Sequence, residues 1–144
     1  MTLRLNPEVR ITFKMEETGP EETLTAIPPD DLVAIAAIRV DCQAAYRAWT
    51  NTEASRRIRA AIESQPDEET TLDVPEEEYA IYERWLSVGL PETVECVTGY
   101  AVNGVDAGQP IEAIRAALKR DQNALPHLRR LRGALFLGMT DDTD

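Results

Sequence analysis

Cysteine and histidine are scarce in this 144-residue sequence, which contains only Cys42, Cys96 and His127. Two cysteines are too few for a disulfide scaffold. Their separation of 54 positions, with a single histidine, does not match the ligand spacing of a zinc site. The longest purely apolar run, Leu32 to Ile38, is far shorter than the ~20 residues that cross a bilayer. No apolar segment of the secretory type is visible near the N-terminus, so a cytoplasmic location is expected.

Residues that commonly carry enzyme chemistry do not occur at recognisable spacings. His127 follows Pro126 in the first turn of an expected helix, where the positive end of the helix dipole favours a neutral surface imidazole. No serine or cysteine partner is recognisable for it. A glutamate precedes Cys96, and a carboxylate beside a thiol raises the pKa of that thiol instead of activating it. Phosphate-binding loops and EF-hand patterns are also missing. The sequence therefore predicts no enzymatic activity, no cofactor and no bound metal ion.

Positive charge is almost missing from the middle of the chain. The sequence has 26 acidic and 15 basic residues, a net charge of −11. Residues 61–110 contain 12 acids and a single base, Arg84, so this third of the chain accounts for the whole net charge. Its densest part is the acidic set, which comprises Glu63, Asp67, Glu68, Glu69, Asp73, Glu76, Glu77 and Glu78.

Cations gather elsewhere, mainly in the last third of the sequence. The basic set comprises Arg115, Lys119, Arg120, Arg129, Arg130 and Arg132. We interpret the two sets as opposite contact surfaces of a polarised molecule. A simpler interpretation also stands, because charged segments often form solvated faces that keep a protein soluble. The 13 arginines against two lysines fit a GC-rich genome, and adaptation to salt would also lower the isoelectric point.

Alternating apolar residues indicate strands in two places. Residues 3–15 are apolar at most odd positions, which predicts a half-buried strand. A polar turn and a return strand over residues 23–27 would complete a hairpin. Residues 91–102 fit either a strand or a helix, with a slight preference for the strand, and Asn103-Gly104 is a turn sequence.

Helical periodicity covers most of the remaining chain. Apolar steps of three and four residues predict the strongest helix over residues 31–49, with Asp30 as its N-cap. A capping box at Thr50 predicts a second helix over residues 51–64. Three further helices are expected to begin at Pro75, Pro110 and Pro126.

The predicted fold class is α+β and helix-dominated, with a small N-terminal β-hairpin sheet followed by about five helices. The length favours one compact domain over residues 1–139, ending in a frayed acidic tail at residues 140–144. Four aromatic residues are candidate interface anchors, although packing in the core is the favoured interpretation: Tyr46, Tyr79, Tyr82 and Trp85. The predicted core residues are Leu32, Ile35, Ile38, Trp49, Ile81, Trp85, Ile114, Leu118, Leu128, Leu131 and Leu135.

The charge polarity leads to three functional hypotheses. The first is a non-enzymatic interaction or assembly component, analogous in architecture to adaptor and connector proteins of bacteria and their phages. Its acidic surface would contact the basic surface of an identical or related subunit, in the cytoplasm or within a phage particle. The second is an acidic mimic of nucleic acid that inhibits a basic nucleic-acid-binding protein. The third is weak DNA binding by the C-terminal helix pair, which has helix-turn-helix proportions but belongs to an acidic chain.

Overall fold

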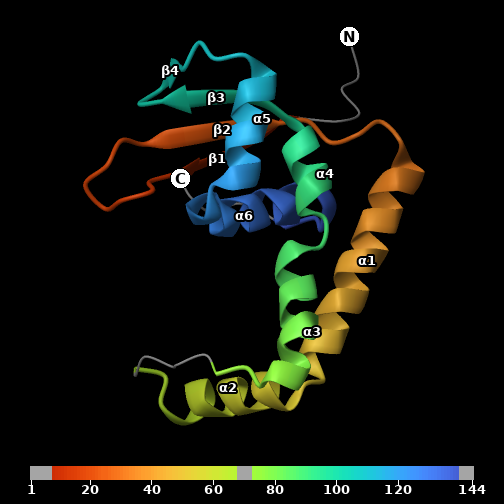
Figure 1. The fold of residues 1–144 in the computed structure, drawn as a ribbon. Coiled ribbons are helices and arrows are strands. Elements are labelled where there is room, and N and C mark those ends of the chain that lie inside the picture. The colour runs from red at the N-terminus through yellow and green to blue at the C-terminus, as the bar shows by residue number, and fades with distance from the viewer. Residues whose placement is uncertain (1–7, 68–72, 140–144) are drawn as a thin grey trace. The chain divides into compact units, whose positions relative to one another are not determined.

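The computed structural model describes residues 8–67 and 73–139 of the chain (Figure 1). Contacts within the chain divide it into two units. Unit 1 consists of Met1–Arg39 and Gly89–Asp144, and unit 2 consists of Val40–Val88. One domain over residues 1–139 stays a prediction, and the predicted tail at residues 140–144 lies outside the described residues.

Unit 1 is built on a four-stranded antiparallel sheet in the order β1-β2-β3-β4. The strands are β1 (Val9–Phe13), β2 (Glu22–Ala26), β3 (Val97–Val102) and β4 (Val105–Asp106). The N-terminal hairpin predicted from the alternating residues is therefore confirmed. Asn103 and Gly104 connect β3 to β4 with φ values of 51° and 81°, which is the backbone that an Asn-Gly hairpin turn requires.

The register of the hairpin decides which side chains face the core. Ile11 lies opposite Leu24, and Phe13 lies opposite Glu22. Because side chains alternate between the two faces of a strand, Glu22 shares the face of Leu24 and Ala26, both of which are fully buried. A carboxylate thus occupies a position of β2 where the alternation calls for an apolar side chain.

Three helices provide the other half of the core of unit 1. They are α4 (Leu90–Glu95), α5 (Ile111–Arg120) and α6 (Leu125–Phe136), with the short 3-10 helix η1 (Gln122–Ala124) between the last two. α6 packs against β1 and α4, and α5 packs against β3 and α4 (Figure 1). Buried apolar side chains from all three helices meet those of the sheet in one cluster. The predicted core residues of α5 and α6 belong to it, namely Ile114, Leu118, Leu128, Leu131 and Leu135.

The ambiguous segment 91–102 is helical in its first part and a strand in its second. α4 follows Gly89, whose φ of 78° ends the preceding helix in the left-handed region, and Pro91 lies in the first turn of α4. The chain leaves the helix at Cys96 and enters β3 at Val97. The slight preference for a strand is thus correct for the second part of the segment and wrong for the first.

The regular elements of unit 2, in the part of it that the structure describes, are all helices. α1 (Leu32–Thr50) begins in unit 1 and ends in unit 2, where α2 (Glu53–Ser64) and α3 (Glu76–Ser87) follow it (Figure 1). Two tilted aromatic pairs join α1 to α3. Tyr46 pairs with Trp85 and Trp49 with Tyr82, each at 4.9 Å between ring centroids. No residue of α3 is fully buried, so these pairs rather than a deep core hold the helix.

The predicted fold class, α+β and helix-dominated with an N-terminal hairpin, is confirmed. Five helices of ten residues or more and the six-residue α4 are present in the described residues. Leu32 was predicted in the core but is 75% exposed, whereas Ile35 and Ile38, further along α1, pack against the core cluster. No described helix is long and apolar enough to cross a membrane.

Two of the predicted helix caps are wrong by one or two residues. Asp31 rather than Asp30 caps α1, since its Oδ1 accepts a hydrogen bond from the Val33 amide at 2.9 Å. Thr52 rather than Thr50 caps α2, accepting from the Ser55 amide. In both cases the first helical residue lies slightly later than the sequence pattern suggests.

Candidate functional site

The acidic set lies in unit 2, on α2, α3 and the segment between them. Glu68 and Glu69 lie outside the described residues. Glu78 is half-buried. The remaining five are exposed, namely Glu63, Asp67, Asp73, Glu76 and Glu77. The set is thus only partly a solvent-facing surface.

Glu78 makes a structural contact within unit 2. Its carboxylate accepts hydrogen bonds from the backbone amides of Glu53, at 2.8 Å, and Ala54, at 3.1 Å. These amides are the first two of α2, and they have no acceptor within their own helix. A negative group at this end of a helix also interacts favourably with the helix dipole. Glu78 of α3 therefore caps α2 across the fold of unit 2.

The arginines of α2 serve the adjacent helix end. Arg56 donates to the carbonyl of Asn51 and Arg59 to the carbonyl of Thr50, each at 2.8 Å. These carbonyls lie at the C-terminal end of α1, where cations are favourable. Opposite charges thus secure the two helix ends that meet at the corner between α1 and α2.

The solvent-facing side of α3 combines carboxylates with an exposed aromatic ring. Glu76 and Glu77 lie in its first turn, and Tyr79 is 50% exposed. The negative charge of Glu83, together with a hydrogen bond to it, raises the pKa of Tyr79, so the phenol stays protonated near neutral pH. We call Glu76, Glu77, Tyr79 and Glu83 the α3 face. Of the other candidate anchors, Tyr46 is exposed while Tyr82 and Trp85 are half-buried.

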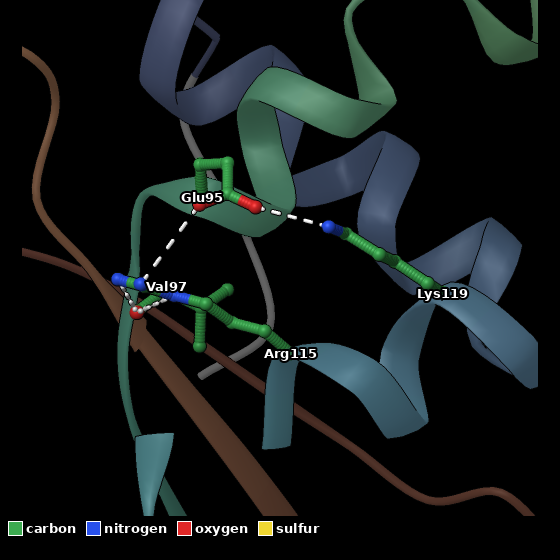
Figure 2. A network of polar contacts seen from close by, with 4 residues as sticks. All are labelled: Glu95, Val97, Arg115 and Lys119. Carbon is green, nitrogen blue, oxygen red and sulfur yellow. Dashed lines mark hydrogen bonds and ion pairs between the residues drawn. The ribbon is translucent and has the colours of Figure 1, made fainter. Parts of the chain in front are cut away.

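The basic set lies in unit 1, and four of its six members are buried or hydrogen-bonded there, since Arg130 also donates to the Thr12 carbonyl at 3.3 Å. Arg132 is only 3% exposed, so it cannot belong to a solvent-facing surface. Arg115 donates from Nε and one terminal nitrogen to the carbonyl of Val97, at 3.2 and 3.0 Å (Figure 2). Lys119 forms an ion pair with Glu95 at 3.0 Å. The more accessible members are Arg120, which is exposed, with Arg129 and Arg130, which are partly exposed.

Glu95 is the anion around which Arg115 and Lys119 gather (Figure 2). The hydrogen bond from Lys119 and its charge lower the pKa of Glu95, and the more distant Arg115 adds to this effect. A lowered pKa in the folded state stabilises the fold above the pKa of the unfolded chain. This contribution is lost as the pH falls through the lower, folded-state pKa.

We expect the pKa of Glu95 to rise toward its ordinary value in Lys119→Met, without reaching it, because Arg115 remains. A pH titration of the Glu95 carboxyl carbon by NMR measures the change. Arg120→Met, which removes an equal charge one residue further on, is the control and should leave the titration of Glu95 nearly unchanged. An equal shift in both variants would assign the effect to net charge instead of the ion pair.

His127 is partly buried, and both cysteines are buried. The imidazole stacks on the ring of Phe13, with centroids 4.1 Å apart and an interplanar angle of 16°. Burial, and to a lesser degree Arg130, lowers the pKa of His127, against an opposing effect of Glu22. The neutral imidazole predicted from the sequence agrees with this direction, but its cause is burial. Burial also raises the pKa of the Cys96 thiol, and Cys42 is buried as well.

A small pocket lies in unit 1, between one end of the sheet and α5, and sequence reasoning missed it. Its volume is about 230 Å³. Apolar walls come from Phe13, Met15, Ile114, Ala117 and Leu118, and polar groups from Glu22, Tyr100, Gln109 and Asp121. The Tyr100 hydroxyl donates a hydrogen bond to Glu22. Burial, followed by the hydrogen bond to Glu22 and its charge, raises the pKa of Tyr100 to about 12, so the phenol remains a donor.

Comparison of the chain with protein-family models, curated protein sequences and solved structures finds no match. Within residues 8–67 and 73–139, no group of three or more histidine, cysteine, aspartate or glutamate side chains is placed to hold a metal ion. The geometry of the surfaces and of the pocket is therefore the basis for assigning a function.

Proposed function

We propose that the protein is a non-enzymatic assembly component whose α3 face binds the accessible arginines of α5 and α6 on a second copy of the chain. The observation that carries the proposal is the exposed ring of Tyr79 among the carboxylates of α3. Tyrosine is enriched among the residues that dominate binding energy at interfaces, and the rim of an interface is polar. A location in the cytoplasm or in a phage particle is part of the same proposal.

The complementary surface is the accessible part of the basic set. Arg120 ends α5 and is exposed, and Arg129 lies on α6 with part of its side chain exposed. Arginine pairs with carboxylates through two parallel hydrogen bonds, which gives orientation as well as attraction. Acidic and basic surfaces on different parts of one chain allow head-to-tail contacts, which close into rings when the rotation between subunits permits.

We expect self-association at low salt that weakens as salt rises, because exposed charges attract over roughly 10 Å at 0.1 M ionic strength and over less at higher salt. Glu76→Lys combined with Glu77→Lys should abolish it. Arg120→Glu combined with Arg129→Glu should abolish it as well. A mixture of the two double variants should restore a dimer, because the first variant keeps the arginines and the second keeps the acidic α3 face. Size-exclusion chromatography with light scattering measures the mass in each case.

The matched control is Glu16→Lys combined with Glu17→Lys, which changes net charge equally at two exposed positions of unit 1. It should keep the association of the unaltered chain. A chain that stays monomeric at low salt, or that loses association equally in the control, contradicts the proposal. If only the acidic pair affects association and the arginine pair does not, head-to-tail assembly is wrong. A basic partner protein, as in the hypothesis of nucleic-acid mimicry, is then favoured.

A further inference from the structure

Glu22 is a charged residue at a position of unit 1 where the alternation along the strand predicts an apolar side chain. It stands on the buried face of β2, in line with Leu24 and Ala26 and directly opposite Phe13. A carboxylate placed there loses hydration, and the Tyr100 hydroxyl compensates by donating to it. Departures from local pattern rules in natural proteins are concentrated at functional sites. The register of β2 against β1 therefore places the Glu22 carboxylate at the pocket instead of in solvent.

The lining of the pocket has one sign of charge. Among its described residues, Glu22 and Asp121 carry carboxylates, and none carries a positive charge. Asp121 comes directly after α5, and its Oδ1 also accepts a hydrogen bond from the Asn123 amide at 2.9 Å. Arg130 donates to the Thr12 carbonyl at 3.3 Å and is not among the residues that line the pocket. A positively charged guest would gain from the two carboxylates.

The rest of the wall is apolar and narrow. Phe13 and Ile114 face the same space as the aliphatic side chain of Leu118. An apolar cavity of about 150 Å³ holds benzene, so about 230 Å³ accommodates a ligand of roughly ten non-hydrogen atoms. Such a ligand has room for a ring or a short chain and one polar head.

We propose that this pocket binds a small organic cation, a primary ammonium carried on an aromatic or short aliphatic stem. The stem packs against Phe13, Ile114 and Leu118, and the ammonium donates to Glu22 and Asp121. The hydrogen bond from the Tyr100 hydroxyl holds the Glu22 carboxylate in place. This inference concerns unit 1 alone, and it does not depend on assembly through the α3 face.

The test is an NMR titration of the ¹⁵N-labelled full chain with 2-phenylethylamine, which is a cation at neutral pH. We expect saturable shifts confined to amides around the pocket. We also expect binding at least about tenfold tighter than that of 2-phenylethanol, which has the same ring and stem, because hydrogen bonds to charged groups are the stronger ones. Equal affinity for the alcohol, or no saturable shift by about 10 mM amine, overturns the proposal.

Matched variants separate the pocket from general electrostatics. Glu22→Gln should weaken binding of 2-phenylethylamine about tenfold or more, whereas Glu21→Gln, which removes an equal charge from the exposed neighbouring residue, should not change it. Ala117→Leu adds side-chain volume on the wall formed by α5 and should abolish binding while keeping a good helix former. Equal effects of the two glutamine variants, or unchanged binding in Ala117→Leu, contradict the proposal.

Discussion

Leu131→Ala is expected to lower the free energy of unfolding by about 2–5 kcal/mol, a large fraction of the 5–15 kcal/mol typical of natural domains. Leu131 is fully buried on α6, within the cluster that joins α6 to the sheet. The substitution removes buried apolar atoms and leaves a cavity that the neighbouring side chains fill only in part. Urea denaturation followed by circular dichroism measures the change.

Leu125→Ala provides the matched control on the same helix. Leu125 begins α6 and is 37% exposed, so removing its side chain leaves no enclosed cavity. The helix propensities of leucine and alanine are close, and we expect a loss below about 1 kcal/mol. Similar losses in the two variants would mean that α6 does not pack against the sheet with the face described above.

α5 and α6 were predicted well because their sequence patterns indicate a helix without any knowledge of the tertiary structure. Each begins at or beside a proline and repeats apolar residues at steps of three and four. Their predicted core residues, including Ile114 and Leu131, are buried. The hairpin of β1 and β2 was equally readable, since alternation of two-residue period has no helical equivalent.

Errors arose where the residue pattern of one segment fitted both a strand and a helix. In the segment 91–102 the residues that favour a strand lie in its second part, and those that favour a helix, led by Pro91, lie in its first. Leu32 fits the helical period of α1 but stays 75% exposed, whereas Ile35 and Ile38 of the same helix pack against the core cluster. Periodicity assigns a residue to a face of its helix, but not to a length of helix that is covered.

The acidic and basic sets could be identified from the sequence, but the groups in the fold that their side chains contact could not. Nothing near Glu78 in the sequence indicates that it caps α2, 24 residues earlier in the chain. Arg132 and Arg129 look alike in the sequence, although only Arg132 is buried. The pocket had one readable signal, because Glu22 alternates with Leu24 and Ala26 and therefore faces the core. That signal becomes meaningful only when the helix that covers this face is known.

Glu78→Ala is expected to destabilise α2 by about 2 kcal/mol, because two amides at the start of the helix lose a charged acceptor. Thr52 still accepts from Ser55, so the helix keeps its own N-cap and loses only the acceptor supplied by α3. The effect should be local. Amides of α2 that exchange by opening of this helix should exchange about thirtyfold faster, whereas those of β1, β2 and α6 should not change. Hydrogen exchange followed by NMR resolves the two groups.

Glu77→Ala distinguishes this cap from the general effect of losing a carboxylate on α3. It removes the same charge from the same first turn, one residue earlier, but Glu77 is exposed. We expect α2 to exchange at its original rate in this variant. Glu78→Gln should fall between the two, because an amide oxygen accepts a hydrogen bond but lacks the charge that strengthens it. If Glu77→Ala and Glu78→Ala accelerate exchange of α2 equally, the contact is electrostatic and unspecific. If neither does, α2 is stabilised by its own sequence alone, and the Glu78 cap contributes nothing to it.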